Sequence, residues 1–453
     1  MAEDQAQNKE ANEIAEESPS LTVFRKEAHD TMLSRINLAS AFKLTPEELR
    51  AEIESFVFDF AQERRAQVTK REQISVAREL VDDMIGLGPL EILLDDDSIS
   101  DIVVNGPHQI YIERGGLMEL ASIRFRDDAH LLQIAQRIAN RVGRRVDTSS
   151  PLCDARLPDG SRVNIVVPPI ALDGASISIR KFSKKALDLN ALAKFGALTE
   201  EMVVVLQVAS TCGLNIIISG GTGSGKTTLL NAMSQLIPNS ERIVTCEDAA
   251  ELKLQQPHVV RLESRPPNIE GKGEITIRDL VKNALRMRPD RIVVGEVRGE
   301  ECVDMLQAMN TGHDGSMSTI HANKAKEAFV RMENMVAMSG FKLPSEVVRA
   351  QIAGAVNIIV QTERLHDGSR KITEIVEIMG VSERGEIEYQ HLFKFLPMGA
   401  TEDHKIFGKF EACVDQPMFL EKAITYGLDK KLLAAMKTAI EKGGRESRDD
   451  SIY

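Results

Sequence analysis

The chain has 453 residues, of which 43% are apolar, and a formal net charge of −12 at pH 7. This composition is ordinary for a soluble globular protein of roughly two to four domains. No stretch approaches the ~20 apolar residues of a membrane span, the acidic start lacks the basic region of a secretion signal, and the negative charge argues against broad nonspecific nucleic-acid binding. We therefore expect a cytoplasmic protein without a stable nucleic-acid partner.

Five cysteines are scattered along the chain without a C-x-x-C pair: Cys153, Cys212, Cys246, Cys302 and Cys413. This spacing argues against both a structural zinc site and a disulfide framework. We expect buried free thiols, because unpaired cysteine packs as a small apolar residue.

The first 94 residues divide into a polar tail and a helical region. Residues 1–20 are rich in glutamate and contain almost nothing apolar, which predicts a disordered acidic tail. From 21 to 94, apolar residues recur at helical spacing. The run Thr45-Pro46-Glu47-Glu48 has the N-cap residue, first-turn proline and N3 glutamate of a helix start. We expect a small helical bundle over 21–94.

Residues 95–180 carry short β-like runs separated by turns, and a helix is expected after Asp127. The expected strands are 99–104, 109–113, 117–125, 154–157, 162–167 and 175–180. These elements predict a small α+β domain of PAS-like type. The polar and basic residues 181–190 are expected to form a linker.

From 191 to 453 strands alternate with helices, which predicts a largely parallel sheet and an α/β fold class. An antiparallel meander is expected at 370–395 and a C-terminal helical extension at 415–442. The expected strands before the meander are 215–219, 242–247, 259–263, 291–294, 315–320 and 357–362. The expected helices include 200–210, 278–287, 300–309 and a helical stretch from 325 to 355.

A glycine-rich run connects the strand at 215–219 to a helix: Gly220-Gly221-Thr222-Gly223-Ser224-Gly225-Lys226-Thr227-Thr228. This is G-x-x-x-x-G-K-T in the strand–loop–helix context of a P-loop. Glycine lets backbone N–H groups approach phosphate oxygens, and the helix N-terminus attracts anions. Lys226 is expected to contact the β- and γ-phosphates and Thr227 to ligate Mg²⁺. A dinucleotide-binding turn fits less well, because Lys226 stands where that turn needs a small neutral residue.

Two further strands of this domain end in acids. Glu247 and Asp248 follow the next strand after the P-loop helix, and Glu247 is expected to orient or deprotonate the attacking water. A simple acidic strand end is the alternative. Glu296 follows the strand 291–294 and is expected to act toward Mg²⁺, although Gly295 replaces the more common aspartate beside it.

Two histidines eight residues apart, His313 and His321, flank a strand of small residues. Metal ligation is one interpretation, but no third ligand stands nearby at metal spacing. We favour a second interpretation, in which one of these histidines contacts the γ-phosphate or a catalytic carboxylate and so senses the nucleotide state.

Phosphoryl transfer also needs positive charge at the transition state, and arginines supply it from a neighbouring domain or subunit. The candidates in the α+β domain are Arg156 and Arg162, expected to be catalytic, and Arg180, expected to bind nucleotide. Arg261 and Arg298 lie nearer to the P-loop in the sequence. We expect one or two of these five to take part.

The order of these motifs resembles the ATPase superfamily of type II and type IV secretion and of type IV pili. The runs 220–228, 247–248, 295–296 and 311–321 correspond to its Walker A, Asp, Walker B and His boxes, and a Gly-Glu Walker B is normal in that family. The resemblance covers about 85–395, and it includes the runs 100–106, 156–162 and 177–181. The stretches 283–291 and 295–299 are similar to those of CpaF-type ATPases of the tight adherence (Tad) pilus. The four-cysteine zinc element of many type II secretion ATPases is absent.

The resemblance implies a RecA-like P-loop domain that works as a homohexamer with ATP and Mg²⁺. It also implies arginines that cross from the α+β domain, and coupling to an integral inner-membrane platform protein and indirectly to pilin. The leading interpretation is a cytoplasmic motor docked at the inner membrane, which hydrolyses ATP to assemble or retract pilin. A type IV secretion ATPase that moves protein or DNA, and a nucleotide-gated regulatory module with negligible turnover, are the alternatives.

Overall fold

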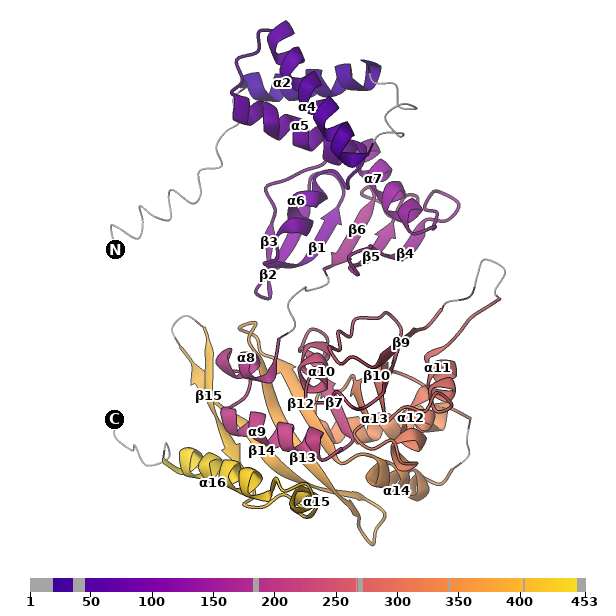
Figure 1. Ribbon diagram of the computed structural model, residues 1–453, viewed down its shortest axis with the longest axis vertical. Coiled ribbons are helices and arrows are strands. Elements are labelled where there is room, and N and C mark those ends of the chain that lie inside the picture. Colours follow the sequence, from indigo (N-terminus) through magenta and orange to yellow (C-terminus); the bar gives the residue numbers. More distant parts are fainter. Residues whose placement is uncertain are drawn as a thin grey trace. The chain divides into compact units, whose positions relative to one another are not determined.

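The computed structural model describes residues 19–35, 45–181, 187–265, 267, 272–340, 343–401 and 404–445 (Figure 1). The chain divides into two compact units, Met1–Phe182 and Ser183–Tyr453. Within the described ranges, no helix is long and apolar enough to cross a membrane. The tail predicted at 1–20 lies outside these ranges except for positions 19 and 20, which begin the first helix.

The first unit begins with helices that share one apolar core. Thr45 and Thr69 each form a capping box with the glutamate three residues later, so the predicted helix start at Thr45 is confirmed. Large apolar side chains such as Phe24, Ile53 and Phe60 are buried between the helices. The helices are α2 (Pro19–Arg35), α4 (Pro46–Glu63) and α5 (Lys70–Met84). The short α6 (Leu90–Asp95) follows them and packs in the core of the sheet described next.

The rest of the first unit is a six-stranded antiparallel sheet in the order β3-β2-β1-β6-β5-β4, against which α7 packs. Asp127 caps α7, as its position predicts. The predicted strand 117–125 ends early, because Ala121 is paired with Ile110, where the neighbouring strand begins. The elements are β1 (Ile99–Asn105), β2 (Ile110–Arg114), β3 (Leu117–Leu120), α7 (Asp128–Arg141), β4 (Leu152–Arg156), β5 (Arg162–Val166) and β6 (Ser176–Arg180).

The second unit is built on a nine-stranded sheet in the order β15-β14-β13-β12-β7-β11-β10-β8-β9. The six strands from β12 to β9 run parallel. β12 to β15 pair antiparallel, so the meander predicted at 370–395 is present and continues into β15, which the sequence did not predict. The strands are β7 (Ile216–Gly220), β8 (Ile243–Glu247), β9 (Val259–Glu263), β10 (Arg291–Val297), β11 (Met317–Ile320), β12 (Ile358–Arg364), β13 (Arg370–Val381), β14 (Ile387–Ala400) and β15 (Ile406–Ala412).

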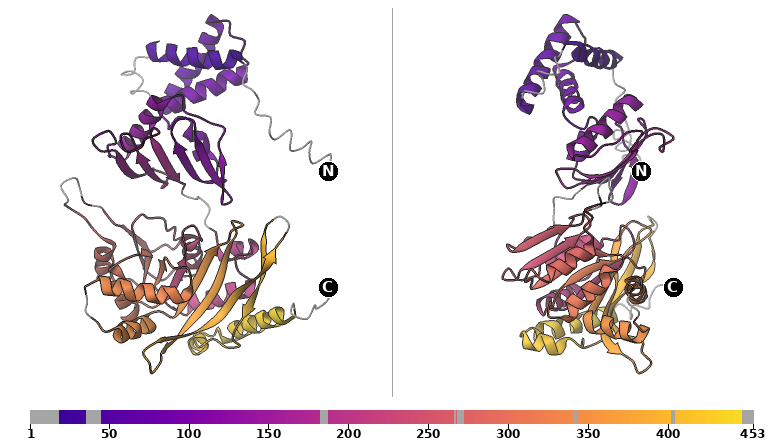
Figure 2. Two further views of the ribbon diagram at one scale, coloured as in Figure 1. Left: turned by 180° about the vertical axis from the view of Figure 1, so that it is seen from behind. Right: turned by 90° about the vertical axis from the view of Figure 1, so that its right-hand side faces the viewer.

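Helices cover both faces of this sheet (Figure 2). Ile216 and Ile218 of β7 pack on one face and Ile217 on the other, as the two-residue period of a strand requires. The first face carries α8 (Leu189–Lys194), α9 (Glu200–Thr211), α10 (Lys226–Ser234), α15 (Leu420–Thr425) and α16 (Asp429–Arg445). The second face carries α11 (Ile277–Ala284), α12 (Glu301–Asn310), α13 (Ala325–Met338) and α14 (Ser345–Ala355).

Two sequence expectations change slightly. The linker predicted at 181–190 ends sooner, because Asp188 already caps α8. Four cysteines are buried as expected, whereas Cys413 is exposed.

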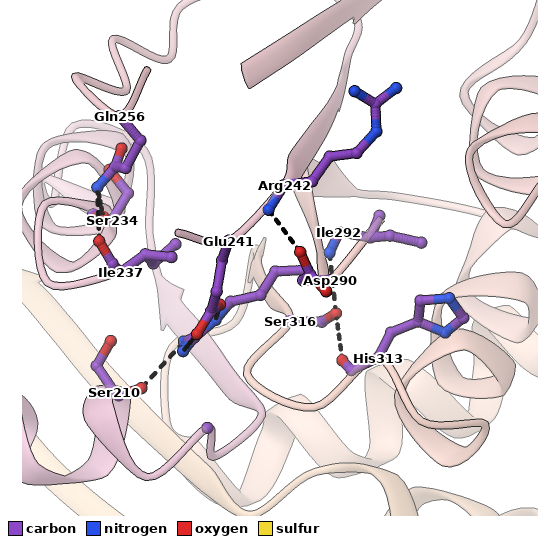
Figure 3. Close-up of polar contacts among 12 residues, drawn as sticks. Ser210, Ser234, Ile237, Glu241, Arg242, Gln256, Asp290, Ile292, His313 and Ser316 are labelled. Atoms are coloured by element: carbon purple, nitrogen blue, oxygen red, sulfur yellow. Dashed lines mark hydrogen bonds and ion pairs between the residues drawn. The ribbon is translucent and has the colours of Figure 1, made fainter. Parts of the chain in front are cut away.

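A buried ion pair ties together the amino ends of the parallel strands. The guanidinium of Arg291, at the start of β10, pairs with Glu241 and donates from Nη1 to the carbonyl of Ser210, 3.0 Å away. Arg291 is only 2% exposed. Figure 3 shows Glu241 and Ser210 at this point, with Ile292 N–H donating to Ser316 Oγ close by. The pair therefore joins α9, the start of β10 and the turn before β8.

Replacing Arg291 with methionine should lower the free energy of unfolding by about 3 kcal/mol, because it breaks a buried ion pair and removes one of the donors to the Ser210 carbonyl. Urea unfolding followed by circular dichroism measures the change. The matched control is Arg331→Met on the exposed face of α13, which should change stability by less than about 0.5 kcal/mol. Equal unfolding midpoints for Arg291→Met and the wild type would contradict the assignment.

Candidate nucleotide-binding site

The glycine-rich loop leaves the carboxyl end of β7 and enters α10. Gly223 and Gly225 have φ angles of +70° and +96°, a region that favours glycine. Gly225 is the N-cap of α10, so the first N–H groups of the helix face the loop. A Cβ at Gly220 would come within 2.6 Å of the Thr362 carbonyl oxygen, so a side chain there would collide with β12. The predicted strand–loop–helix arrangement of a P-loop is thus present.

The neighbouring strand β12 supports the loop. The hydroxyls of Ser224 and Thr362 lie 2.9 Å apart, and Thr362 Oγ1 donates to the carbonyl of Ser219, 3.3 Å away. Both hydroxyls are buried. These contacts hold the buried side of the loop against β12 while Thr222 and Gly223 stay exposed.

The ammonium group of Lys226 folds back over its own loop. Nζ donates to the carbonyl oxygens of Gly220 at 3.0 Å and of Gly221 at 2.9 Å. Burial lowers the pKa of Lys226, and the nearby negative charge of Glu296 opposes that shift. The ammonium group is therefore held at the start of its own loop, and phosphate oxygens can replace the two carbonyls as its partners.

Glu247, the last residue of β8, is held rigidly. Its side chain is 1% exposed, and its Oε2 accepts hydrogen bonds from the N–H groups of Glu251 at 2.7 Å and Leu252 at 2.8 Å. The other oxygen, Oε1, is buried and has no hydrogen-bond partner within normal geometry among the described residues. Burial raises the pKa of Glu247, against the lowering effect of those two N–H groups. One oxygen thus fixes the carboxylate, and the other is buried beside it without a donor among the described residues.

Gly295 makes room for Glu247. A Cβ at Gly295 would lie 3.0 Å from Glu247 Cγ, because β10 runs beside β8. Between Val294 and Val297, β10 has one residue more than β11 has opposite it, which is a β-bulge at Gly295 and Glu296. An aspartate at position 295 would be crowded here, so the Gly-Glu pair has a structural reason.

Glu296 and Arg298 form an ion pair beside the loop. Arg298 donates to Glu296 Oε2 from Nε at 3.0 Å and from Nη2 at 2.6 Å, and its Nη1 lies 3.6 Å from an oxygen of Asp248. Glu301 accepts hydrogen bonds from the N–H groups of Arg298 and Gly299 and thereby anchors the turn. Arg298 thus links the two acidic strand ends. Arg261 instead donates to the Ala250 carbonyl and braces the loop after Glu247.

The two histidines lie at opposite edges of the sheet. In the β11–β7 register Ile320 is opposite Ser219, so His321 follows β11 at the P-loop edge. His313 precedes β11, and its Nδ1 lies 3.2 Å from the Ala308 carbonyl oxygen. Figure 3 shows it beside Ser316, which donates to its carbonyl. A four-residue strand of about 13 Å separates His313 from the P-loop edge, so His321 is the histidine that lies at this edge, and the prediction that one of the two contacts the γ-phosphate or a catalytic carboxylate stays a prediction. For the same reason the two histidines share no metal ion.

The three arginines predicted in the α+β domain belong to the first unit and lie next to one another. In the sheet register Arg156 is opposite Arg162, and Arg162 is opposite Arg180. Arg180 also donates from Nε to Asp101, 3.2 Å away. These three residues, at directly opposite positions of adjacent strands, form what we call the arginine row. The sequence did not indicate the row, because its members come from three strands.

Two arginines that sequence reasoning missed lie beside the P-loop. Arg370 Nε donates to the Gly223 carbonyl at 2.9 Å, and Arg364 Nη1 lies 3.5 Å from the position of a Cβ at Gly223. They flank the turn between β12 and β13. No motif marks them, since their place depends on β12 pairing with β7. Thr227 stands in the first turn of α10, where its prediction as a metal ligand remains a prediction.

Comparison with known proteins agrees with this geometry. Residues 83–404 match the family described as "Type II/IV secretion system protein". The chain therefore belongs to the type II/IV secretion ATPase superfamily, and its second unit is the RecA-like P-loop domain of that family.

Individual relatives include a Mycobacterium tuberculosis protein described as a "putative conjugal transfer protein", 41% identical over 310 residues that cover 67% of this chain and 88% of the relative. "Type IV secretion system protein VirB11" of Bartonella quintana is 33% identical over 328 residues, which cover 64% of this chain and 91% of that relative. Among solved structures, the VirB11 ATPase of the Brucella suis type IV secretion system in complex with sulphate is 32% identical, covers 63% of this chain and 94% of that one, and has a TM-score of 0.35.

Replacing Glu247 with glutamine should stabilise the protein at neutral pH, and the gain should disappear as the pH falls. Burial raises the pKa of Glu247 above its value in the unfolded chain, so the wild type loses stability as the pH rises through the folded pKa. Glutamine does not ionise, and its oxygen can still accept the two backbone N–H groups. Thermal unfolding from about pH 4 to about pH 8 tests this.

Glu388→Gln, at an exposed position of β14, serves as the control and should show no such pH-dependent difference. If Glu247→Gln is destabilised at neutral pH, or changes stability equally at every pH, burial is not the dominant influence on this carboxyl group.

Proposed function

We propose that this chain is an ATP-hydrolysing motor of a type IV pilus or secretion machine, nearest in kind to the ATPase of the Tad pilus. The observation that carries the proposal is the convergence of Lys226, Glu247 and Glu296 at one edge of the sheet. β8 and β10 carry the two glutamates, and β7 leads into the loop before Lys226. These strands end at the same edge because they run parallel. Family membership gives the secretion class, and the runs at 283–291 and 295–299 support the Tad subtype.

The P-loop residues supply the phosphate-binding part. Backbone N–H groups of residues 220–228 surround the phosphates, and Lys226 exchanges its two carbonyl partners for β- and γ-phosphate oxygens. The Thr227 hydroxyl and the Glu296 carboxylate are hard oxygen ligands at this edge and fit Mg²⁺. Bound Mg²⁺ would neutralise charge on the phosphates. Glu296 would then exchange at least part of its contact with Arg298 for the hydrated cation.

Glu247 is the proposed general base. Two backbone N–H groups fix its Oε2, so Oε1 can accept a hydrogen bond and then a proton from the attacking water. A raised pKa makes this carboxylate a stronger base than an exposed glutamate. A module that only binds nucleotide has no need of a buried carboxylate held in this way, and this favours turnover over a purely regulatory role. His321, at the same edge, is the remaining histidine candidate for sensing the nucleotide.

The arginine row of the first unit is proposed to complete the site in a homohexamer. Arg156 and Arg162 would stabilise the charge that develops on the γ-phosphate, and Arg180 would contact the nucleotide. Their adjacent positions in three paired strands support a joint role, since directly opposite residues lie on the same face of the sheet. In this scheme the motion between the units, driven by ATP, is the motor stroke.

The proposed setting is cytoplasmic, with docking at an integral inner-membrane platform protein and indirect action on pilin. The net charge of −12 disfavours a stable nucleic-acid partner. The similarity to a "putative conjugal transfer protein" and to VirB11 favours a second candidate, a type IV secretion ATPase that moves protein or DNA. A chromosomal Lys226→Ala variant distinguishes the two candidates. Loss of surface pili supports the pilus motor, and loss of secreted protein or DNA supports the type IV secretion ATPase.

Lys226→Ala and Glu296→Ala should each lower the steady-state rate of ATP hydrolysis by about 100-fold or more, because each removes charge stabilisation from the phosphates or Mg²⁺. Phosphate release by the purified full chain measures this, with Arg384→Ala on the β13–β14 turn as the control. A wild type that hydrolyses no ATP in any oligomeric state would refute the motor.

If the arginines act between subunits, two inactive variants should restore activity to each other. Lys226→Ala lacks the phosphate-binding cation, and Arg156→Ala lacks the arginine. A mixed ring contains some sites with Lys226 from one subunit and Arg156 from its neighbour. We expect mixtures to hydrolyse ATP at least about tenfold faster than either variant alone, since an arginine finger contributes about a thousandfold or more. An additive, uncomplemented rate would place Arg156 outside the neighbour's site.

A further inference from the structure

The turn between β12 and β13, residues 365–369, stands beside the P-loop. Thr362, near the end of β12, is bound to Ser224 and to the Ser219 carbonyl. The turn is therefore held against the loop by contacts within the second unit. It carries the two arginines that no motif indicated, Arg364 before it and Arg370 after it.

These two arginines are opposite one another in the β12–β13 register and share one neighbour, the exposed tip of the P-loop. Arg370 Nε donates to the Gly223 carbonyl at 2.9 Å, and its Cδ lies 3.4 Å from the position of a Cβ at Gly225. Arg364 Nη1 lies 3.5 Å from the corresponding position at Gly223. Two guanidinium groups therefore approach the tip of the P-loop from one neighbouring hairpin.

The turn that holds the arginines is rigid. Asp367 accepts hydrogen bonds from the N–H and hydroxyl of Ser369 and from the N–H of Ile406 on β15. Burial alone would raise the pKa of Asp367, but these hydrogen bonds together lower it to about 2. The carboxylate thus stays ionised and pins the turn to β15. The bases of both arginine side chains are fixed before any ligand arrives.

The side of the loop on which the arginines lie indicates which part of a nucleotide they can reach. In a P-loop the phosphates sit among backbone N–H groups, and Lys226 and α10 receive the terminal phosphates. A carbonyl that accepts from Arg370 points away from that cradle. Arg364 and Arg370 therefore lie outside it, where the nucleoside end of the ligand leaves the loop. A planar guanidinium stacks on aromatic rings as well as pairing with anions.

We propose that Arg364 and Arg370 bind the nucleoside end of the nucleotide, with a guanidinium stacked on the purine base. This inference rests on the proposed nucleotide function, because it needs a nucleotide in the P-loop. It assigns base contacts to the second unit itself, separate from the arginine row of the first unit.

Binding measured without turnover tests the proposal. Isothermal titration of the full chain in the absence of Mg²⁺ compares ATP, ADP and inorganic triphosphate. Arg364→Ala should weaken the binding of ATP and of ADP by about tenfold, because one stacked guanidinium is lost. It should change the affinity for triphosphate by less than about twofold. Arg370→Ala should weaken ATP binding by at least the same factor. Arg364→Lys keeps the positive charge but loses the planar guanidinium group, so it should bind ATP little better than Arg364→Ala does.

Arg384→Ala is the matched control, since it removes an exposed arginine at the other end of β13, and it should bind ATP as the wild type does. Wild-type ATP affinity in both Arg364→Ala and Arg370→Ala overturns the inference. So does an equal loss for triphosphate, which would make these arginines phosphate contacts, or full recovery in Arg364→Lys.

The two proposals fail in different ways. A wild type that binds ATP but does not hydrolyse it refutes the motor and leaves the arginine result standing. A wild type that hydrolyses ATP, with Arg364→Ala and Arg370→Ala binding it normally, refutes the nucleoside contact alone. A wild type that binds no ATP refutes both.

Discussion

The parallel pairing of β7 with β11 on one side and β12 on the other is the constraint on which the site depends. Because all three strands run in the same direction, Ser219 lies opposite Ile320 and Gly220 lies opposite Thr362. The P-loop, His321 and the β12–β13 turn therefore emerge at one edge. The pairing of β10 with β11 and β8 brings Glu296 and Glu247 to the same edge. Reversing or shifting any of these strands would separate the groups that the chemistry needs together.

Close approach at that edge accounts for two glycines that motif matching alone leaves unexplained. A side chain at Gly220 would collide with β12, and one at Gly295 would crowd Glu247. At Gly220 the neighbouring strand passes so near that only a hydrogen fits, whereas at Gly295 the side chain of Glu247 would have to shift. The bulge at Gly295 adds one residue to β10 just before Glu296 and changes where that carboxylate points. The glycines are thus consequences of packing between strands as much as of phosphate binding.

The charged groups of the site already have partners that a ligand can replace. Lys226 is bound to two carbonyls of its own loop, and Glu296 is bound to Arg298. Nucleotide and Mg²⁺ would exchange these contacts for stronger ones, which limits the desolvation cost of each buried charge. Glu247 differs, because one of its oxygens is fixed by backbone N–H groups while the other is buried and finds no partner in the described part of the chain. That asymmetry is suited to a group whose partner is a transient water molecule.

The sequence by itself determined the features that depend on a few neighbouring residues. These are the P-loop, the capped helices at Thr45 and Asp127, the alternation of strands and helices, and the acids at the ends of β8 and β10. Only the tertiary structure decided what depends on strand order and register. It separated His313 from His321, aligned Arg156, Arg162 and Arg180 in one row, and brought Arg364 and Arg370 to the loop. Local hydrogen bonding and side-chain periodicity are readable along the chain, whereas pairing between distant strands is settled by the packing of the whole sheet.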